Sequence, residues 1–325
     1  MRIEEFSETL NRLGGERVPF LFLIDFEMKK PVIITLDNVN ENEILFDIQG
    51  FTNAVSKADK DSRPDVLLEK HPITFRDYQK KFDLVFDRLC YGDSFLTNLT
   101  TQTEIKTNSS LRDLFFHSKA KYKLLFHDQF MFFSPETFIQ IRDGKIFSYP
   151  MKGTIDADLP EAETTILNDQ KELAEHVTIV DLIRNDLSQI ATNVKVSRFR
   201  YIEEIKTDTK NLLQVSSEIE GDLPDDYLSN LGSIIVSLLP AGSVSGAPKK
   251  RTVEIIHQAE GEDRGYYTGV FGYFDGHKLD SAVMIRYIEN KKEKLFYRSG
   301  GGITTQSVVE GEYREMIDKV YVPLT

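Results

Sequence analysis

The segment TFIQIRDGKIFSYP, residues 137–150, decides the fold. Its two arms lie on either side of Asp143-Gly144, and Asp-Gly between alternating arms is a strong hairpin signal. Two further strand-like runs, YKLLF at 122–126 and QFMFF at 129–133, precede it with a tight turn between them. Parallel neighbours need long crossover connections, so these short turns predict an antiparallel sheet.

A second series of strand-like runs separated by tight turns lies near the C-terminus. GVFGYF (269–274) and KLDSAVMIRYI (278–288) flank Asp275-Gly276, and KLFYR (294–298) follows the turn Asn290-Lys291-Lys292. Strands are also predicted at 18–26 and 31–36. Helices are predicted in separate blocks, at residues 2–13, 75–91, 161–190, 225–238, 248–259 and 310–320. Hairpin strands with separate helical blocks indicate an α+β fold.

The chain shows no internal repeat and no compositional shift that would mark a domain boundary. Residues 54–73 are polar and charged and are predicted to form an exposed loop. A chain of 325 residues can bury a sizeable core. We therefore predict one domain over residues 1–325.

Composition excludes several classes of function. The 40 basic and 52 acidic residues give a formal charge of −12, which argues against non-specific nucleic-acid binding and requires a cationic pocket for any anionic substrate. The single cysteine excludes a disulfide within the chain and fits a reducing compartment. The opening MRIEEFSETL lacks a signal-peptide pattern, and apolar runs such as 18–24 are too short to span a bilayer. The sequence predicts a cytoplasmic protein with no membrane contact.

Two helical segments carry paired glutamates. In NDQKELAEHVTIVDLIRNDLSQI (168–190), Glu172 and Glu175 share one face. The apolar stripe of that helix is expected to consist of Leu173, Val177, Val180, Ile183, Leu187 and Ile190. In EGEYREMIDKV (310–320), Glu312 and Glu315 share a stripe with Lys319. The apolar side of that helix is expected to consist of Tyr313, Met316, Ile317 and Val320.

Each pair alone is compatible with a solvated acidic face. If the two helices face one cavity, the four carboxylates repel one another and require protons or a cation. Carboxylate oxygens suit a hard ion such as Mg²⁺. Sequence spacing does not show that the two helices meet.

Two further charged residues follow predicted strands, at positions where functional side chains often lie. They are Glu136 in Ser134-Pro135-Glu136 and Lys152 in PMKGT (150–154). Either is compatible with a surface charge. A buried glutamate can instead keep its proton and act as an acid, and a desolvated lysine can become a nucleophile.

Two glycine-rich loops complete the candidate site. The segment PAGSVSGAP (240–248) precedes a helix whose first turn is expected to carry Pro248, and exposed amides at a helix start attract anions. It is not a Walker loop, because no Gly-Lys-Ser/Thr ends it. Ser299-Gly300-Gly301-Gly302 follows KLFYR and is expected to let backbone amides approach a carboxylate. Either loop is also compatible with a simple turn.

Together these motifs resemble the chorismate-utilising enzymes. The resemblance covers residues 75–320, after a shortened N-terminal part at about 1–74. It rests on SPE (134–136), PMKGT (150–154), KELAEH (171–176), DLIRNDL (181–187), PAGSVSGAPKKR (240–251), RGYYTGVFGYF (264–274), the arginine of MIRY, SGGGI and EYREMIDK. It implies two antiparallel β-sheets packed as a sandwich with helices outside.

The resemblance also implies a role for each motif residue. Glu175 and Glu315 are expected to bind Mg²⁺, with Glu172 and Glu312 beside them. Glu136 is expected to be the general acid that protonates the departing ring hydroxyl. The groups expected to bind the substrate and its two carboxylates are Thr154, Tyr267, Arg286, Gly300, Gly301, Gly302 and Lys319.

Two positions sort the members of the family. Water-adding members have a lysine that activates water, and the matching position is Leu96, which disfavours isochorismate and salicylate synthesis. At the third position of PMKGT, anthranilate synthases usually have alanine and aminodeoxychorismate synthases lysine, as Lys152 here. The resemblance thus implies that Lys152 attacks C2 of chorismate while the C4 hydroxyl leaves. Ammonia then adds at C4 and expels the lysine, giving 4-amino-4-deoxychorismate for p-aminobenzoate and folate synthesis.

Two positions depart from the family pattern. Leu96 replaces the glutamine common in amine-adding members, and Leu213 stands where many relatives have histidine, so a polar contact is expected to be missing. Cys90 lies outside a G-x-C-x-G nucleophile elbow, so a separate glutamine amidotransferase subunit is the implied ammonia source. Two alternatives stay open. One is anthranilate synthase component I, and the other is a catalytically silent regulatory homologue.

Overall fold

Two large antiparallel β-sheets form the body of the protein. The computed structural model describes residues 1–54, 66–206 and 211–324. The first sheet contains, in spatial order, β11 (Met151–Asp156), β13 (Asn211–Asp222), β10 (Lys145–Ser148), β9 (Thr137–Arg142), β16 (Leu279–Val283), β15 (Val270–Phe274), β1 (Phe20–Ile24) and β2 (Val32–Thr35), with β12 (Thr192–Lys206) paired to β13. The second contains β14 (Gly246–Ala247), β6 (Leu96–Thr107), β18 (Lys294–Ile303), β17 (Tyr287–Lys291), β8 (Phe130–Ser134), β7 (Tyr122–Phe126), β3 (Ile44–Ile48) and β4 (Phe51–Thr52), with β5 (Leu68–His71) paired to β6.

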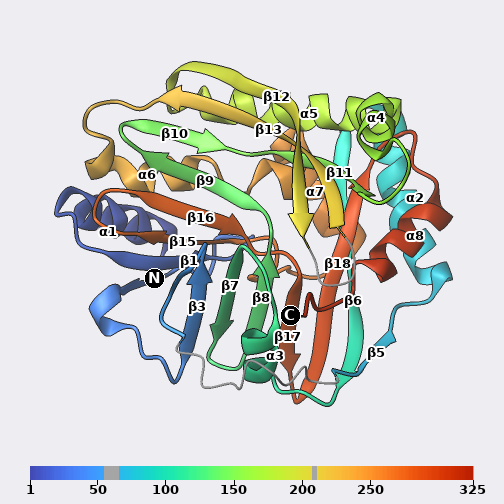
Figure 1. Ribbon diagram of the computed structural model, residues 1–325, viewed down its shortest axis with the longest axis horizontal. Helices are drawn as coiled ribbons and strands as arrows, with labels where there is room; N and C mark the ends of the chain where they lie inside the picture. Colours follow the sequence, from blue (N-terminus) through green and yellow to red (C-terminus); the bar gives the residue numbers. More distant parts are fainter. Residues whose placement is uncertain (55–65, 207–210, 325) are drawn as a thin grey trace.

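Helices surround the two sheets (Figure 1). They are α1 (Ile3–Gly15), α2 (Phe75–Tyr91), α3 (Leu111–His117), α4 (Ala162–Asn168), α5 (Gln170–Leu187), α6 (Leu231–Ser237), α7 (Lys249–Glu260) and α8 (Val309–Asp318), with 3₁₀ turns η1 (Leu36–Asn38), η2 (Tyr227–Asn230) and η3 (Gly242–Val244). The predicted α+β sandwich with helices outside is confirmed.

Strand β1 shows why the sheets stack in this way. Its sequence FLFLI is buried throughout. Phe20, Phe22 and Ile24 join the core formed with α1 and α6, whereas Leu21 and Leu23 join the core shared with the second sheet. Successive strand side chains point to opposite faces, so a strand covered on both faces reads as a continuous apolar run. On the far side of the second sheet, α2, α7 and α8 pack on β6 and β18.

Several predicted elements are confirmed closely. The segment 137–150 forms the hairpin β9–β10, and both Asp143 and Gly144 have positive φ, of 52° and 73°. Strand β7 and helix α2 have the predicted bounds, 122–126 and 75–91. Of the predicted loop 54–73, residues 55–65 lie outside the described part of the chain, and residues 68–71 form β5.

Other predictions are wrong in ways that shape the site. The predicted strand 278–288 breaks at Arg286, whose φ is +55°, and continues from β16 of the first sheet into β17 of the second. The predicted loop Ser299–Gly302 is part of β18, since its backbone pairs with β6 along 98–101. The predicted turn 290–292 lies two residues later, at Lys292 and Glu293, both with positive φ. Strand β6 and the hairpin β12–β13 were not predicted.

One segment, residues 227–244, has the length and hydropathy of a membrane-spanning helix, contrary to the sequence-based expectation. It is not one continuous helix, because it divides into η2, α6 and η3. Leu231, Ile235 and Leu238 from it belong to the core beside the first sheet. The core helix of a globular protein has the same composition, so this segment is weak evidence for a membrane.

Candidate active site

One cavity of about 520 Å³ collects the residues singled out in the sequence. Every residue assigned there to catalysis, substrate or metal lines it: Glu136, Lys152, Thr154, Glu172, Glu175, Tyr267, Arg286, Gly300, Gly301, Gly302, Glu312, Glu315 and Lys319. They come from β11, α5, β18, α8 and the connections after β8, α7 and β16, which lie far apart in the sequence. Their shared cavity is an observation, and their individual roles stay predictions.

The glutamates of α8 face the glycines of β18. A Cβ atom on Gly301 would lie 3.3 Å from Oε2 of Glu312 and 3.5 Å from Oε1 of Glu315. The same atom would lie 3.7 Å from Nζ of Lys319, which is 2.6 Å from Glu315 Oε1 and donates to the Gly300 carbonyl at 2.9 Å. Glycine therefore keeps this stretch of the strand open toward two carboxylates and one ammonium group.

The glutamates of α5 face β11 across the same cavity. The Asp169 side chain accepts from the Glu172 amide at 2.9 Å and caps the helix, which fixes its first turn. A Cβ on Gly153 would lie 3.2 Å from Glu172 Oε2, and Lys152 Nζ donates to Glu175 Oε2 at 3.1 Å. Gly153 has a φ of +79° and forms a bulge in β11, and such bulges re-aim neighbouring side chains.

The apolar stripe predicted for α5 is correct only in part. Val180, Ile183 and Leu187 contact the core, but Val177 is 46% exposed. His176 is buried in its place and shares a 2.7 Å hydrogen bond with the Ser217 hydroxyl. The N-terminal part of α5 packs against β11 and β13. The buried face of the helix there passes through position 176 instead of the predicted position 177.

The carboxylates fit a divalent cation by charge and by donor type. Four glutamates from two helices line one cavity, and Lys152 and Lys319 contact Glu175 and Glu315 there. Carboxylate oxygens are the ligands that Mg²⁺ prefers in proteins. Glu175 and Glu315, with Glu172 and Glu312 beside them, are therefore suited to hold one.

Lys152 is partly exposed to the cavity and lies in a strongly acidic setting. Desolvation lowers the pKa of its ammonium group, but the charges of Glu175, Glu172 and Glu315 raise it more, so its pKa is above the ordinary value. A lysine nucleophile needs a pocket that desolvates it, and here the neighbouring carboxylates outweigh the desolvation.

Glu136 has the environment of an acid. Burial raises the pKa of its carboxyl group above the ordinary value, against the opposing effects of Ser243 and two lysines. The Ser243 hydroxyl donates to Oε1, and the Glu136 amide donates to Ser134 Oγ at 3.0 Å. These contacts fix the carboxyl group at the cavity wall.

Two further side chains face the cavity from its basic side. Arg286 lies where the chain crosses between the sheets. Its guanidinium donates to the Lys319 carbonyl at 3.3 Å and lies 4.5 Å from the Tyr321 ring centre. Tyr267 is buried, which raises the pKa of its hydroxyl to about 12, so it stays a neutral donor at pH 7.

The sequence analysis missed several cavity residues. Ser243, Asn98 and Arg298 line it. Ser243 could have been found, since it lies in the quoted loop 240–248. Arg298 is 2% exposed and bonds Glu289 at 2.8 Å, and no sequence signal separated it from a surface arginine.

Two neighbouring positions differ in what they bring to the cavity. Among the described residues lining the cavity, Gln214 is present and Leu213 is not, so the polar side chain that this strand supplies there is Gln214. Pro248 is the residue before α7 and not part of its first turn. Of the loop 240–248, only Ser243 and Val244 reach this cavity, so the start of α7 is not its anion site.

The family model of chorismate binding enzymes matches residues 30–325. The chain belongs to this family. It is 51% identical, over 100% of both chains, to a protein of Pasteurella multocida named as an uncharacterized PabA-like protein. It is 33% identical to aminodeoxychorismate synthase component 1 of Salmonella typhimurium over 75% of this chain and 56% of that one. It is 35% identical to anthranilate synthase component 1 of Aquifex aeolicus over 57% of this chain and 38% of that one.

A solved structure shares the fold of this chain. The putative 2,3-dihydroxybenzoate-specific isochorismate synthase from Bacillus anthracis superposes with a TM-score of 0.72 at 21% identity, covering 98% of this chain and 87% of that one. Membership in the chorismate binding enzymes indicates an enzyme that converts chorismate. The family match begins at residue 30, well before residue 75, where the resemblance was expected to start.

Proposed function

We propose that this enzyme converts chorismate and ammonia into 4-amino-4-deoxychorismate. The observation that carries the proposal is the presence, in one cavity, of Lys152 and of Glu136, whose carboxyl pKa is raised by desolvation. A nucleophile and an acid that line the same cavity suit a reaction in which one bond forms as a hydroxyl leaves.

The chain's own residues supply each step. Lys152 first gives up its ammonium proton to solvent, and its free amine then attacks C2 of the ring. The double bond shifts, and the C4–O bond breaks as Glu136 gives its proton to the hydroxyl, which leaves as water. Ammonia then attacks C4, the double bond shifts back, and the lysine is released from C2. Arg286, Lys319 and the Tyr267 hydroxyl would bind the substrate carboxylates, since charge-assisted hydrogen bonds are needed to hold a dianion in an acidic protein.

Mg²⁺ would be held by Glu175 and Glu315 and would neutralise the negative charge of the substrate carboxylate. The ammonia would come from a separate glutamine amidotransferase subunit, because no nucleophile elbow accompanies Cys90. The single cysteine and the biosynthetic substrate support a place in the cytoplasm.

Anthranilate synthase component I is the second candidate, and the 35% identity to such an enzyme favours it. Both candidates use the same cavity and the same acid. They differ in whether nitrogen arrives at C4 or at C2. Lys152 favours the first, because a lysine already bonded at C2 blocks attack there.

The test is intact-protein mass spectrometry with chorismate and Mg²⁺ but without ammonia. Wild type should gain the mass of chorismate less one water, and Lys152→Ala should not. Lys250→Ala, which changes an exposed lysine at the start of α7, should gain the same mass as wild type. If no adduct forms and Lys152→Ala still makes 4-amino-4-deoxychorismate at the normal rate, the proposal loses its main support.

A further inference from the structure

The carboxyl group of Glu136 has one hydrogen-bond donor among the described residues. This donor is the Ser243 hydroxyl, which binds Oε1. Both side chains are partly exposed, and both line the active-site cavity. They also line a second, smaller cavity of about 30 Å³. The proposed acid and its donor therefore lie together where the two cavities approach each other.

The backbone of Glu136 is fixed on both sides of its side chain. Its amide donates to Ser134 Oγ at 3.0 Å, and its carbonyl accepts from the Val283 amide at 3.1 Å. The remaining freedom is rotation of the side chain itself. The Ser243 hydrogen bond restricts that rotation, because turning the carboxyl group away would break it.

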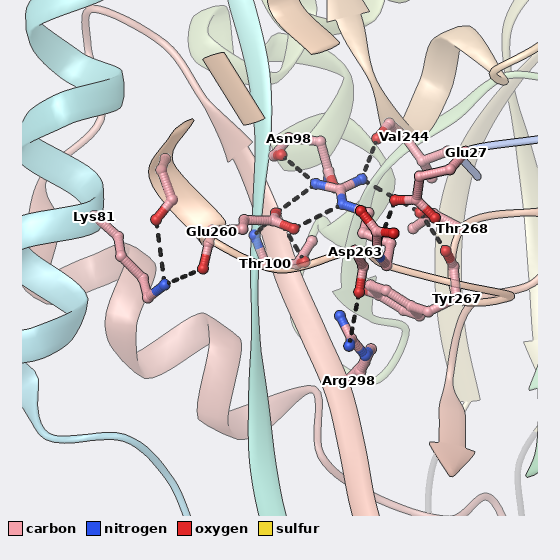
Figure 2. Close-up of polar contacts among 12 residues, drawn as sticks. Glu27, Lys81, Asn98, Thr100, Val244, Glu260, Asp263, Tyr267, Thr268 and Arg298 are labelled. Carbon is pink, nitrogen blue, oxygen red and sulfur yellow. Dashed lines mark hydrogen bonds and ion pairs between the residues drawn. The ribbon is translucent and has the colours of Figure 1, made fainter. Parts of the chain in front are cut away.

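The turn that carries Ser243 is held by a buried ion pair. Ser243 lies in η3, and the next carbonyl, that of Val244, accepts from Arg264 Nη1 at 2.8 Å. Arg264 is 1% exposed and pairs with buried Glu260 at 2.6 Å. Figure 2 shows the groups gathered around this guanidinium group, which are Asn98, Val244, Glu260 and Thr268. The position of the Ser243 hydroxyl is therefore set by the core of the protein.

This hydrogen bond has two chemical consequences for the carboxyl group. An oxygen that accepts a hydrogen bond has one lone pair engaged, so the proton of the acid belongs on the other oxygen, Oε2. Once the proton has left, Oε1 is part of a carboxylate. Hydrogen bonds to charged acceptors are stronger than those to neutral ones, so the Ser243 hydroxyl stabilises the group that remains after proton transfer.

We infer that Ser243 is a positioning residue for the acid: it directs the Glu136 proton to Oε2 and stabilises the carboxylate left when the C4 hydroxyl departs. This inference rests on the proposed function. The electrostatics agree with the geometry. Burial raises the pKa of the Glu136 carboxyl group, whereas the Ser243 hydroxyl, Lys152 and Lys319 lower it.

Other charged or titratable groups share the two cavities with Glu136. Besides the two lysines and the four glutamates of α5 and α8, they are Tyr149, Asp186, Tyr267, Arg286, Tyr297 and Arg298. A substitution at Ser243 leaves all of these groups in place. A change in the pH dependence of such a variant therefore reports on the serine hydroxyl.

The test is the pH dependence of kcat at saturating chorismate, Mg²⁺ and ammonium chloride. Ser243→Ala removes the donor and should lower kcat about tenfold, with the KM for chorismate within about twofold of wild type. Wild-type kcat should decline as the pH rises through the pKa of Glu136, because the acid loses its proton. Loss of the hydroxyl raises this pKa further, so the decline in Ser243→Ala should begin at a higher pH.

Three variants control the experiment. Ser243→Thr keeps the hydroxyl and should keep kcat within about threefold of wild type, with the decline at the wild-type pH. Ser243→Cys keeps the size with only a weak donor and should lie between wild type and Ser243→Ala. Ser237→Ala changes an exposed serine of α6 that lines neither cavity and bonds the Ile234 carbonyl, so it should behave as wild type. Thermal melting checks that each variant folds, and Ser243→Cys keeps the test valid if Ser243→Ala does not.

Other outcomes overturn the inference. A raised chorismate KM with the decline unmoved assigns Ser243 to substrate binding. A decline at the wild-type pH in both Ser243→Ala and Ser243→Cys leaves the hydroxyl no influence on the acid. If wild type aminates chorismate and Glu136→Gln lacks the decline, while Ser243→Ala behaves as wild type, only this inference fails. If wild type makes no aminated product, the proposed function fails and the inference with it.

Discussion

Gly301→Ala should lower kcat/KM strongly without unfolding the protein. The new Cβ would lie 3.3 and 3.5 Å from carboxylate oxygens of Glu312 and Glu315. These two carboxylate groups would therefore have to move by only a few tenths of an ångström. The φ of Gly301 lies outside the positive range that other residues avoid. Alanine in a strand also costs less conformational entropy than glycine, so the free energy of unfolding should change by less than about 1 kcal/mol.

The substrate should be affected much more. The methyl group would stand between β18 and the carboxylates of Glu312 and Glu315, where the proposed function requires a substrate carboxylate to bind. Loss of one hydrogen bond to a charged group costs about 1.5–3 kcal/mol, so kcat/KM should fall by about 10- to 150-fold. Assays of chorismate consumption at saturating Mg²⁺, beside urea unfolding of the same sample, measure both quantities.

Gly300→Ala is the matched control for this experiment. Its Cβ would collide with the Leu99 carbonyl oxygen and lie 2.7 Å from the Thr100 Cα, so the backbone of β6 would have to move. We expect it to lower the free energy of unfolding by about 3 kcal/mol. Wild-type kcat/KM in Gly301→Ala would refute the reasoning, as would a loss of stability equal to that of Gly300→Ala.

Three further predictions concern the acid, the metal and the buried ion pair. Glu136→Gln should still bind chorismate but should lower kcat by about 10²–10⁴. Wild-type activity should fall as the pH rises through the raised pKa of Glu136, because the acid loses its proton. The pH profile of the variant should lack this decline. Excess chelator should abolish turnover, and full activity in chelator would contradict the metal site. Glu175→Gln or Glu315→Gln should lose metal-dependent activity with an unchanged melting temperature. Arg264→Met should lower the free energy of unfolding by about 3–5 kcal/mol in urea, because Glu260 loses its buried cation, and adding Glu260→Leu should recover part of that loss.

Local sequence signals were enough for the hairpin β9–β10 and for helix α2. Asp143-Gly144 and the alternating arms around it specify a tight turn without reference to the rest of the chain. The strand break at Arg286 had no such signal, since MIRYI reads as a continuous strand. That break depends on the passage of the chain from one sheet to the other, which is a property of the whole fold.

The candidate site was also predictable only in those features that local sequence signals determine. Paired glutamates at helical spacing were visible in the sequence, but their meeting depends on the pairing of β6 with β18, about 200 residues away. That pairing also converts Ser299–Gly302 from a predicted loop into a strand lying beside α8.

The central claim is that this enzyme aminates chorismate at C4. Incubation of the purified protein with chorismate, Mg²⁺ and ammonium, followed by identification of the product by mass and fluorescence, tests it most directly. The account predicts 4-amino-4-deoxychorismate. Anthranilate or isochorismate as the product, or unchanged chorismate, would contradict it.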